Sequence, residues 1–222
     1  MIKDTCFPCP KCNWPMCSED CCSKEDHLLE CEVFSSAGFK VNYKKFDYEN
    51  FELLYDTLTP IRILALKNKK PTNWKNLKSL MSHLDIWKKD PLWVKDHEFA
   101  ANFILENLNM NVKKDDILEI FGIGYINDFS MFVGDVKPRV IYPKVAMISH
   151  DCAPNVGRYI HNIGANNKMQ CIAATNIKKG EKLSITYLDV LQPGFIRREI
   201  LSRVIIKLFG SKLRSFEHLW SP

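Results

Sequence analysis

The sequence contains no apolar run long enough to cross a membrane, because Arg62 and Lys207 interrupt the longest candidates. Its first residues, MIKDTCFPCP, lack the apolar core of a secretory signal peptide. No Asn-x-Ser/Thr acceptor for glycosylation occurs anywhere in the chain. We therefore expect an intracellular protein, in the nucleus, the cytoplasm or both, with no membrane partner.

The charge balance also lacks an extreme. The 31 basic and 26 acidic residues leave a formal charge of +5 over 222 residues, and no basic block stands out. Direct binding of nucleic acid is therefore not favoured. The hydrophobic share of 46% and the charged share of 26% are ordinary for a globular protein. A chain of this length can bury one substantial core and a small module.

Cysteine is abundant in one place only. Seven of the nine cysteines lie in residues 6–31, where the pattern reads Cys9-x2-Cys12, Cys17-x3-Cys21 and His27-x3-Cys31. A Cys-x2-Cys hook brings two thiolates to one ion, and residues four apart share one face of a helix. The spacing predicts a structural zinc site in a reduced, intracellular chain. Free or disulfide-linked cysteines are the alternative interpretation.

Residues 36–123 show helical spacing of apolar side chains, which predicts a helical insert. We expect Pro60 in the first turn of one helix, Thr72 as an N-cap, and Asp90-Pro91 at the start of another helix. Gly122-Ile123-Gly124 lacks the third glycine and the preceding strand of a dinucleotide-binding loop. We interpret this pair of glycines as a helix stop.

The last part of the chain reads as strands around a polar loop. Residues 125–131, 156–163 and 168–175 have strand-like patterns, a short strand precedes Tyr187, and a helix carrying Arg197-Arg198 follows. The loop holds Ser149, His150 and Cys152 next to a Pro-Asn break. Nucleophilic catalysis by Cys152 and His150 is an alternative that lacks an evident third, orienting group.

Two blocks of this region resemble the C-terminal half of a SET methyltransferase domain. The family loop Asn-His-Ser-Cys-x-Pro-Asn matches residues 149–155, SHDCAPN, and Gly-Glu-Glu-Leu followed by tyrosine matches residues 180–183 and Tyr187. The resemblance implies methyl transfer from S-adenosylmethionine to a lysine amine, with Tyr187 shaping the lysine channel. It also implies a cofactor site at Asn127, Ser149 and His150. Because Ser149 replaces asparagine, we expect cofactor binding to weaken by about 1 kcal/mol.

The cysteine-rich segment resembles a MYND zinc finger, which binds two zinc ions. When the ligands of the family are carried over by position, the second zinc site is complete and the first is not. The second site would use Cys9, Cys12, His27 and Cys31. The first would receive Cys17 and Cys21, with Cys6 as a substitute ligand and Cys22 as a spare thiol, so that one zinc is expected and a second is left open.

The combination of finger and SET blocks resembles the SET and MYND domain family, and residues 12–17 and 30–34 resemble its insect-type SmydA branch. We expect a chain that is incomplete at both ends. A SET glycine turn would precede the finger in the family, and a Cys-x-Cys-x2-Cys hook would follow Arg197-Arg198. Without that hook Cys152 is expected to be a buried small hydrophobe. Exposed apolar surface near the C-terminal helix would favour self-association or partner binding.

We therefore predict an α+β fold in four parts: a MYND-like zinc finger (1–35), a helical insert (36–123), a partial β-rich SET core (124–190), and a C-terminal helix and tail (191–222). The predicted function is that of a SET/MYND protein-lysine methyltransferase homologue, weak or inactive in this chain. The alternative is a zinc-dependent protein-interaction module. Zinc and S-adenosylmethionine are the candidate cofactors. The expected partners are proteins bound by the finger and a histone or another lysine-bearing protein, with a role in transcription regulation.

Overall fold

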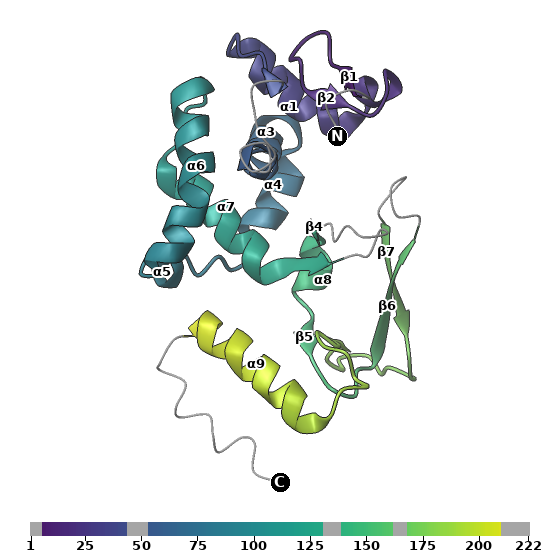
Figure 1. Ribbon diagram of the computed structural model, residues 1–222. Helices are drawn as coiled ribbons and strands as arrows, with labels where there is room; N and C mark the ends of the chain where they lie inside the picture. The colour runs from purple at the N-terminus through teal and green to yellow at the C-terminus, as the bar shows by residue number, and fades with distance from the viewer. Residues whose placement is uncertain (1–5, 44–52, 131–138, 162–167, 210–222) are drawn as a thin grey trace. The chain divides into compact units, whose positions relative to one another are not determined.

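The structure is a computed structural model that describes residues 6–43, 53–130, 139–161 and 168–209 (Figure 1). The chain forms two compact units, Met1–Gly122 and Ile123–Pro222. The mixed α and β content confirms the predicted fold class. Among the described residues, no helix has both the length and the apolar character that a bilayer span requires. The division into four parts remains a prediction.

The first unit begins with a small hairpin followed by helices. Strands β1 (Phe7–Pro8) and β2 (Pro15–Met16) pair antiparallel around a turn in which Asn13 adopts a left-handed φ of 61°. A short 3-10 helix, η1 (Asp20–Ser23), leads into α1 (Glu25–Ser36). Asparagine tolerates the left-handed conformation, and its side chain donates a hydrogen bond of 2.6 Å to the Val41 carbonyl. The turn is thereby tied to the segment that follows α1.

Further helices follow along the described part of the chain: α3 (Leu58–Lys69), α4 (Pro71–Lys78), α5 (Leu84–Trp87), α6 (Pro91–Asn107) and α7 (Lys114–Asn127). Helix α1 packs against α3. Trp14 stacks on Phe34 with ring centroids 5.8 Å apart, and Phe34 contacts Phe39. Aromatic side chains of the cysteine-rich segment are therefore part of a packed apolar interior, which also buries Leu54, Ile61, Ile104 and Ile117.

Several predicted helix boundaries can be compared with the structure. Pro60 lies in the first turn of α3, and Asp90 caps α6 by accepting hydrogen bonds from the backbone N–H groups of Leu92 and Trp93, as predicted. The prediction for Thr72 is wrong. Helix α4 begins two residues earlier than this cap implies, at Pro71, because the fixed φ of proline suits the first helical position, and Lys70 occupies the cap.

The predicted helix stop at Gly122 and Gly124 is also wrong, since α7 continues through both glycines to Asn127. A Cβ atom on Gly122 would lie 2.5 Å from the Ser82 carbonyl oxygen, which is closer than any side chain tolerates. Gly122 is therefore needed for close approach rather than for ending the helix. The strand predicted over 125–131 is shorter, β3 (Asp128–Ser130), and Met131 lies outside the described residues.

The described residues of the second unit form three strand pairs and the helices α8 and α9. Strand β3 pairs antiparallel with β4 (Arg139–Ile141), and α8 (Pro143–Ala146) follows. Strand β5 (Ser149–His150) pairs in parallel with β8 (Ser184–Ile185). Strands β6 (Val156–His161) and β7 (Lys168–Ala173) form the long green hairpin in Figure 1, and α9 (Gly194–Phe209) follows.

This unit has a small core in which Phe129, Val156 and Ile185 are buried. The strand predicted over 156–163 and the C-terminal helix are confirmed within the described ranges, and the strand predicted over 168–175 is confirmed as far as Ala173. Residues 162 and 163 lie outside those ranges.

Candidate functional site

The structure brings four predicted metal ligands together. The ligating atoms of Cys9, Cys12, His27 and Cys31 all lie within 4.8 Å of one another, and the four side chains are 0–3% exposed. The Sγ atoms of Cys9 and Cys31 are 3.8 Å apart, as are Sγ of Cys12 and Nε2 of His27. Tetrahedral zinc with Zn–S bonds of about 2.3 Å requires sulfur separations of about 3.8 Å. This donor set therefore fits zinc.

Local sequence explains how these ligands meet. Cys9 and Cys12 lie in the turn between β1 and β2, where the Cys9 N–H donates a hydrogen bond to the Trp14 carbonyl and the Asn13 N–H donates one to the Cys9 carbonyl. His27 and Cys31 lie one turn apart on α1, so both face the same side of that helix.

Burial makes the thiolate forms of Cys12 and Cys31 unfavourable unless a cation lies beside them. Burial raises the pKa of Cys9, but hydrogen bonds from the backbone of Cys12 and Lys11 oppose this effect, and the pKa is lowered to about 6. Burial raises the pKa of Cys12 well above its usual range, and nearby Cys31 and Cys9 raise it further. Burial likewise raises the pKa of Cys31. Three buried thiolates this close repel one another, and a divalent ion offsets that repulsion.

Two residues behind the cluster ligand His27 were not predicted. Glu30 is fully buried, with one carboxylate oxygen 3.1 Å from Nδ1 of His27, and Arg62 from α3 donates to both oxygens of the same carboxylate. The position of Glu30, three residues after His27 on a helix, was a usable signal. Arg62 is 32 residues away in sequence, and no local pattern connects it with the finger.

Cys17 and Cys21 lie outside this cluster. Cys17 is exposed, and Cys21 accepts a hydrogen bond from the Ser18 hydroxyl at 3.5 Å. Within residues 6–43, 53–130, 139–161 and 168–209, no other group of three metal-ligating side chains comes together. The assignment of Cys17 and Cys21 to a second zinc therefore remains a prediction.

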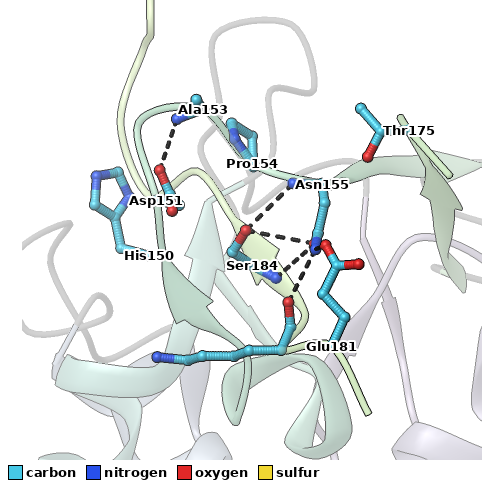
Figure 2. Close-up of a pocket in the computed structure, with 9 residues that line it drawn as sticks. His150, Asp151, Ala153, Pro154, Asn155, Thr175, Glu181 and Ser184 are labelled. Carbon is cyan, nitrogen blue, oxygen red and sulfur yellow. Dashed lines mark hydrogen bonds between the residues drawn. The ribbon is translucent and has the colours of Figure 1, made fainter. Parts of the chain in front are cut away.

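In the second unit, Asn155 joins the two motif blocks (Figure 2). Its side-chain oxygen accepts a hydrogen bond of 2.9 Å from the Ser184 N–H, and its amide nitrogen donates to the Lys182 carbonyl at 2.9 Å and to Glu181 at 3.3 Å. Glu181 also accepts from the Lys178 N–H at 3.0 Å. The Asn of the loop and the Glu of the later turn are thus structural partners that link the two motifs.

Tyr187 is held against the loop by two hydrogen bonds. Its backbone N–H donates to Nδ1 of His150 at 2.9 Å, and its hydroxyl donates to the Ile148 carbonyl at 2.7 Å. Partial burial of the phenol raises the pKa of Tyr187, although 45% of the residue is exposed. Burial lowers the pKa of His150, the neighbouring charge of Asp151 opposes this, and the charge of Arg197 adds to the lowering. Neutral His150 therefore presents a lone pair on Nδ1 to Tyr187.

A cavity of about 380 Å³ borders this loop. Its lining is largely polar and consists of His150, Asp151, Ala153, Pro154, Asn155, Thr175, Glu181, Lys182 and Ser184 (Figure 2). Of the three residues predicted to hold S-adenosylmethionine, only His150 lines it.

The other two predicted cofactor residues lie elsewhere in the unit. Ser149 lies in β5, and Asn127 is the last residue of α7, where its amide donates to the Ile123 carbonyl at 2.8 Å. The cavity therefore does not test the cofactor assignment, which stays a prediction.

Cys152 differs from its prediction, because its side chain is exposed rather than buried. Its Sγ lies 3.4 Å from Nε2 of His150. Since Nδ1 of His150 accepts from Tyr187, neutral His150 carries its proton on Nε2, facing the sulfur. That tautomer has no lone pair with which to remove the thiol proton, so the geometry argues against nucleophilic catalysis by this pair.

Comparisons with known proteins agree with the motifs. The family model of the SET domain matches residues 7–188. A SET and MYND domain-containing protein from Dictyostelium discoideum is 22% identical over 88% of this chain and 44% of its own length. The human N-lysine methyltransferase SMYD2 is 25% identical over 90% of this chain and 45% of its own length.

A shorter match is more similar. Histone-lysine N-methyltransferase SET5 from Saccharomyces cerevisiae is 36% identical over 50% of this chain and 19% of its own length. The chain thus spans less than half the length of these curated relatives.

Proposed function

The chain belongs to the SET-domain family, and we propose that it is a SET-and-MYND protein-lysine methyltransferase homologue of the insect type whose methyl transfer is weak or absent. The observation that carries this proposal is the attachment of Tyr187 to the loop by two hydrogen bonds, through His150 and Ile148. A tyrosine fixed at the loop is suited to orienting an amine for displacement, because such a site gains rate mainly from positioning.

In this proposal Asn127, Ser149 and His150 hold S-adenosylmethionine, which when bound supplies an electrophilic methyl group. Ser149 contributes one hydroxyl where the family asparagine offers both a donor and an acceptor, so part of the binding energy is lost. Tyr187 orients the lysine amine of a histone or another protein. Its 45% exposure supports weak activity, since a tyrosine that lines a narrow channel gains most when water is excluded.

Calorimetric titration with S-adenosylmethionine tests the cofactor site. Ser149→Asn restores the family side chain and should tighten binding by about 1 kcal/mol, or roughly fivefold. Asn127→Ala should weaken binding, and Tyr187→Phe should leave it within about twofold while lowering methyl transfer to a histone-tail peptide. If neither the natural chain nor Ser149→Asn shows a heat of binding at high micromolar cofactor, the cofactor assignment is wrong.

A second candidate function, a zinc-dependent protein-interaction module, is supported by the complete and buried ligand set of the finger. In this case the finger binds a lysine-bearing protein such as a histone, in the nucleus or the cytoplasm, without catalysis. Fluorescence anisotropy of a labelled histone-tail peptide provides the test. Zinc is removed with a chelator, and the loss of the finger's structure is verified separately. Peptide binding that persists under these conditions would contradict this candidate.

A further inference from the structure

The carboxylate of Glu30 lies directly behind the metal ligand His27. Oε1 of Glu30 and Nδ1 of His27 are 3.1 Å apart, and both side chains are buried. Because an ionised carboxylate only accepts hydrogen bonds, Nδ1 carries the proton and donates it. The lone pair of His27 is then on Nε2, which lies 3.8 Å from Sγ of Cys12 inside the cluster. Glu30 therefore selects the tautomer that can bind a metal ion.

Arg62 completes this arrangement from a different helix. Its Nε donates to Oε2 of Glu30 at 2.5 Å, and its Nη2 donates to Oε1 at 2.8 Å. Three thiolates and one divalent ion carry one net negative charge, and the buried carboxylate of Glu30 adds a second. A buried carboxylate costs several kcal/mol unless it is paired, and the two-pronged guanidinium provides the pair.

We infer that Arg62 is a positioning residue for the metal centre and acts on His27 through Glu30. Because Glu30 lies on α1 and Arg62 lies on α3, metal binding and the packing of α3 against α1 stabilise each other. This inference concerns the metal centre alone and does not depend on methyl transfer. It assigns to the helical insert a role in metal affinity that the finger sequence does not reveal.

The chain supplies a matched control for this inference. Lys69 and Glu32 form an ion pair of 2.7 Å between the same two helices, α3 and α1. Glu32 is exposed and pairs with Lys69 rather than with a metal ligand. An exposed pair contributes little to stability, about 1 kcal/mol at most. Lys69→Met therefore removes a link between the helices without touching the cluster.

The experiment measures zinc affinity of the full chain by competition with a chromophoric chelator. Arg62→Met and Glu30→Gln should each weaken zinc binding by about tenfold or more, and Lys69→Met should stay within about twofold of the natural chain. The double variant Arg62→Met/Glu30→Gln should bind about as weakly as the weaker single variant, because both changes interrupt one chain of contacts. The visible spectrum of the Co²⁺-loaded chain should show the same four ligands in every variant.

Hydrogen exchange provides a readout that does not depend on affinity. Saturating zinc should slow amide exchange in both α1 and α3 of the natural chain, but mainly in α1 of Arg62→Met. Zinc affinity of Arg62→Met within twofold of the natural chain would overturn the inference, as would full additivity of the Arg62 and Glu30 changes. If Arg62→Met does not fold, Arg62→Lys takes its place, because lysine cannot form the two-pronged contact and should also weaken binding. Unchanged affinity in that variant would overturn the inference.

Discussion

The metal cluster of the first unit and the Tyr187 loop of the second are built in different ways. In the cluster, the functional atoms themselves are buried and gathered, with four ligands at 0–3% exposure and a buried carboxylate behind one of them. In the loop, the buried and hydrogen-bonded parts are mostly scaffold, such as Asn155 and Ile185, while Tyr187 and Cys152 remain exposed. In the cluster the ligand atoms themselves are already in place, whereas in the loop it is the supporting hydrogen bonds beside a polar cavity that are in place.

This difference shows that a conspicuous motif can specify architecture as strongly as chemistry. Asn155 matches the last residue of the loop motif, yet its side chain is used to join residues 181–184 to the loop. In the finger, by contrast, each motif residue of the complete site offers a side-chain ligand atom to the metal. The first expected consequence is that removal of the metal should affect the two units very differently.

Zinc removal should produce the largest effect. The affinity of structural zinc sites amounts to about 10 kcal/mol or more of folding free energy. Chelation, or Cys12→Ser, should therefore unfold the segment from β1 to α1 while the β6–β7 hairpin keeps its protection. Hydrogen exchange with and without chelator measures both regions in one sample. Equal loss of protection in both would show that the two units do not differ in this way.

Asn155→Ala should give the next largest effect and should spare the metal centre. The change removes the hydrogen bonds to Ser184, Lys182 and Glu181, each worth about 1 kcal/mol, so we expect a loss of about 2–3 kcal/mol in the second unit. Asn176→Ala, at an exposed position, is the matched control. Urea unfolding followed by a probe in the second unit measures the loss, and zinc affinity should not change.

The two glycines of α7 differ in the space available beside them. Gly122→Ala should destabilise the chain by about 1–3 kcal/mol, because the new methyl group would collide with the Ser82 carbonyl. Gly124→Ala should instead stabilise it by up to about 1 kcal/mol, since nothing lies within 4 Å and alanine favours a helix. Thermal unfolding measures both. Equal shifts in the same direction would show that the close approach to Ser82 is not important.

The smallest effect concerns pH and the loop. The pKa of His150 lies below its ordinary value of 6.5 in the folded chain, so the unfolded chain takes up the proton first. The stability of the second unit should be complete above about pH 6.5 and fall as the pH decreases toward the folded-state value. His150→Gln should remove this slope. Hydrogen exchange in β5 and β8 at several pH values separates this pH dependence of the second unit from the loss of zinc in the first unit.

The spacing of residues in the sequence predicted the structural features that depend on residues close together in the chain. The Cys9, Cys12, His27 and Cys31 set followed from a hook and a helical turn, and the β6 and β7 strands followed from their patterns. Contacts between distant segments were not predictable in this way. Arg62 reaches Glu30 from another helix, and Gly122 is explained only by the Ser82 carbonyl.

The exposure of Cys152 likewise depends on what surrounds the loop rather than on the loop itself. The extension of α7 through two glycines shows the same limit. Local propensity opposes a helix there, and packing against another segment decides the outcome.

The parallel pairing of β5 with β8 bears on the order of folding. These two short strands are separated in sequence by the whole β6–β7 hairpin, whereas β6 and β7 are joined by one short connection. Loop closure costs entropy before distant contacts form, so the hairpin should form early and the β5–β8 pair late. Interactions that form after the transition state mainly slow unfolding. The side chain of Asn155 would then chiefly slow the unfolding of the β5–β8 pair, without increasing the rate at which this pair forms.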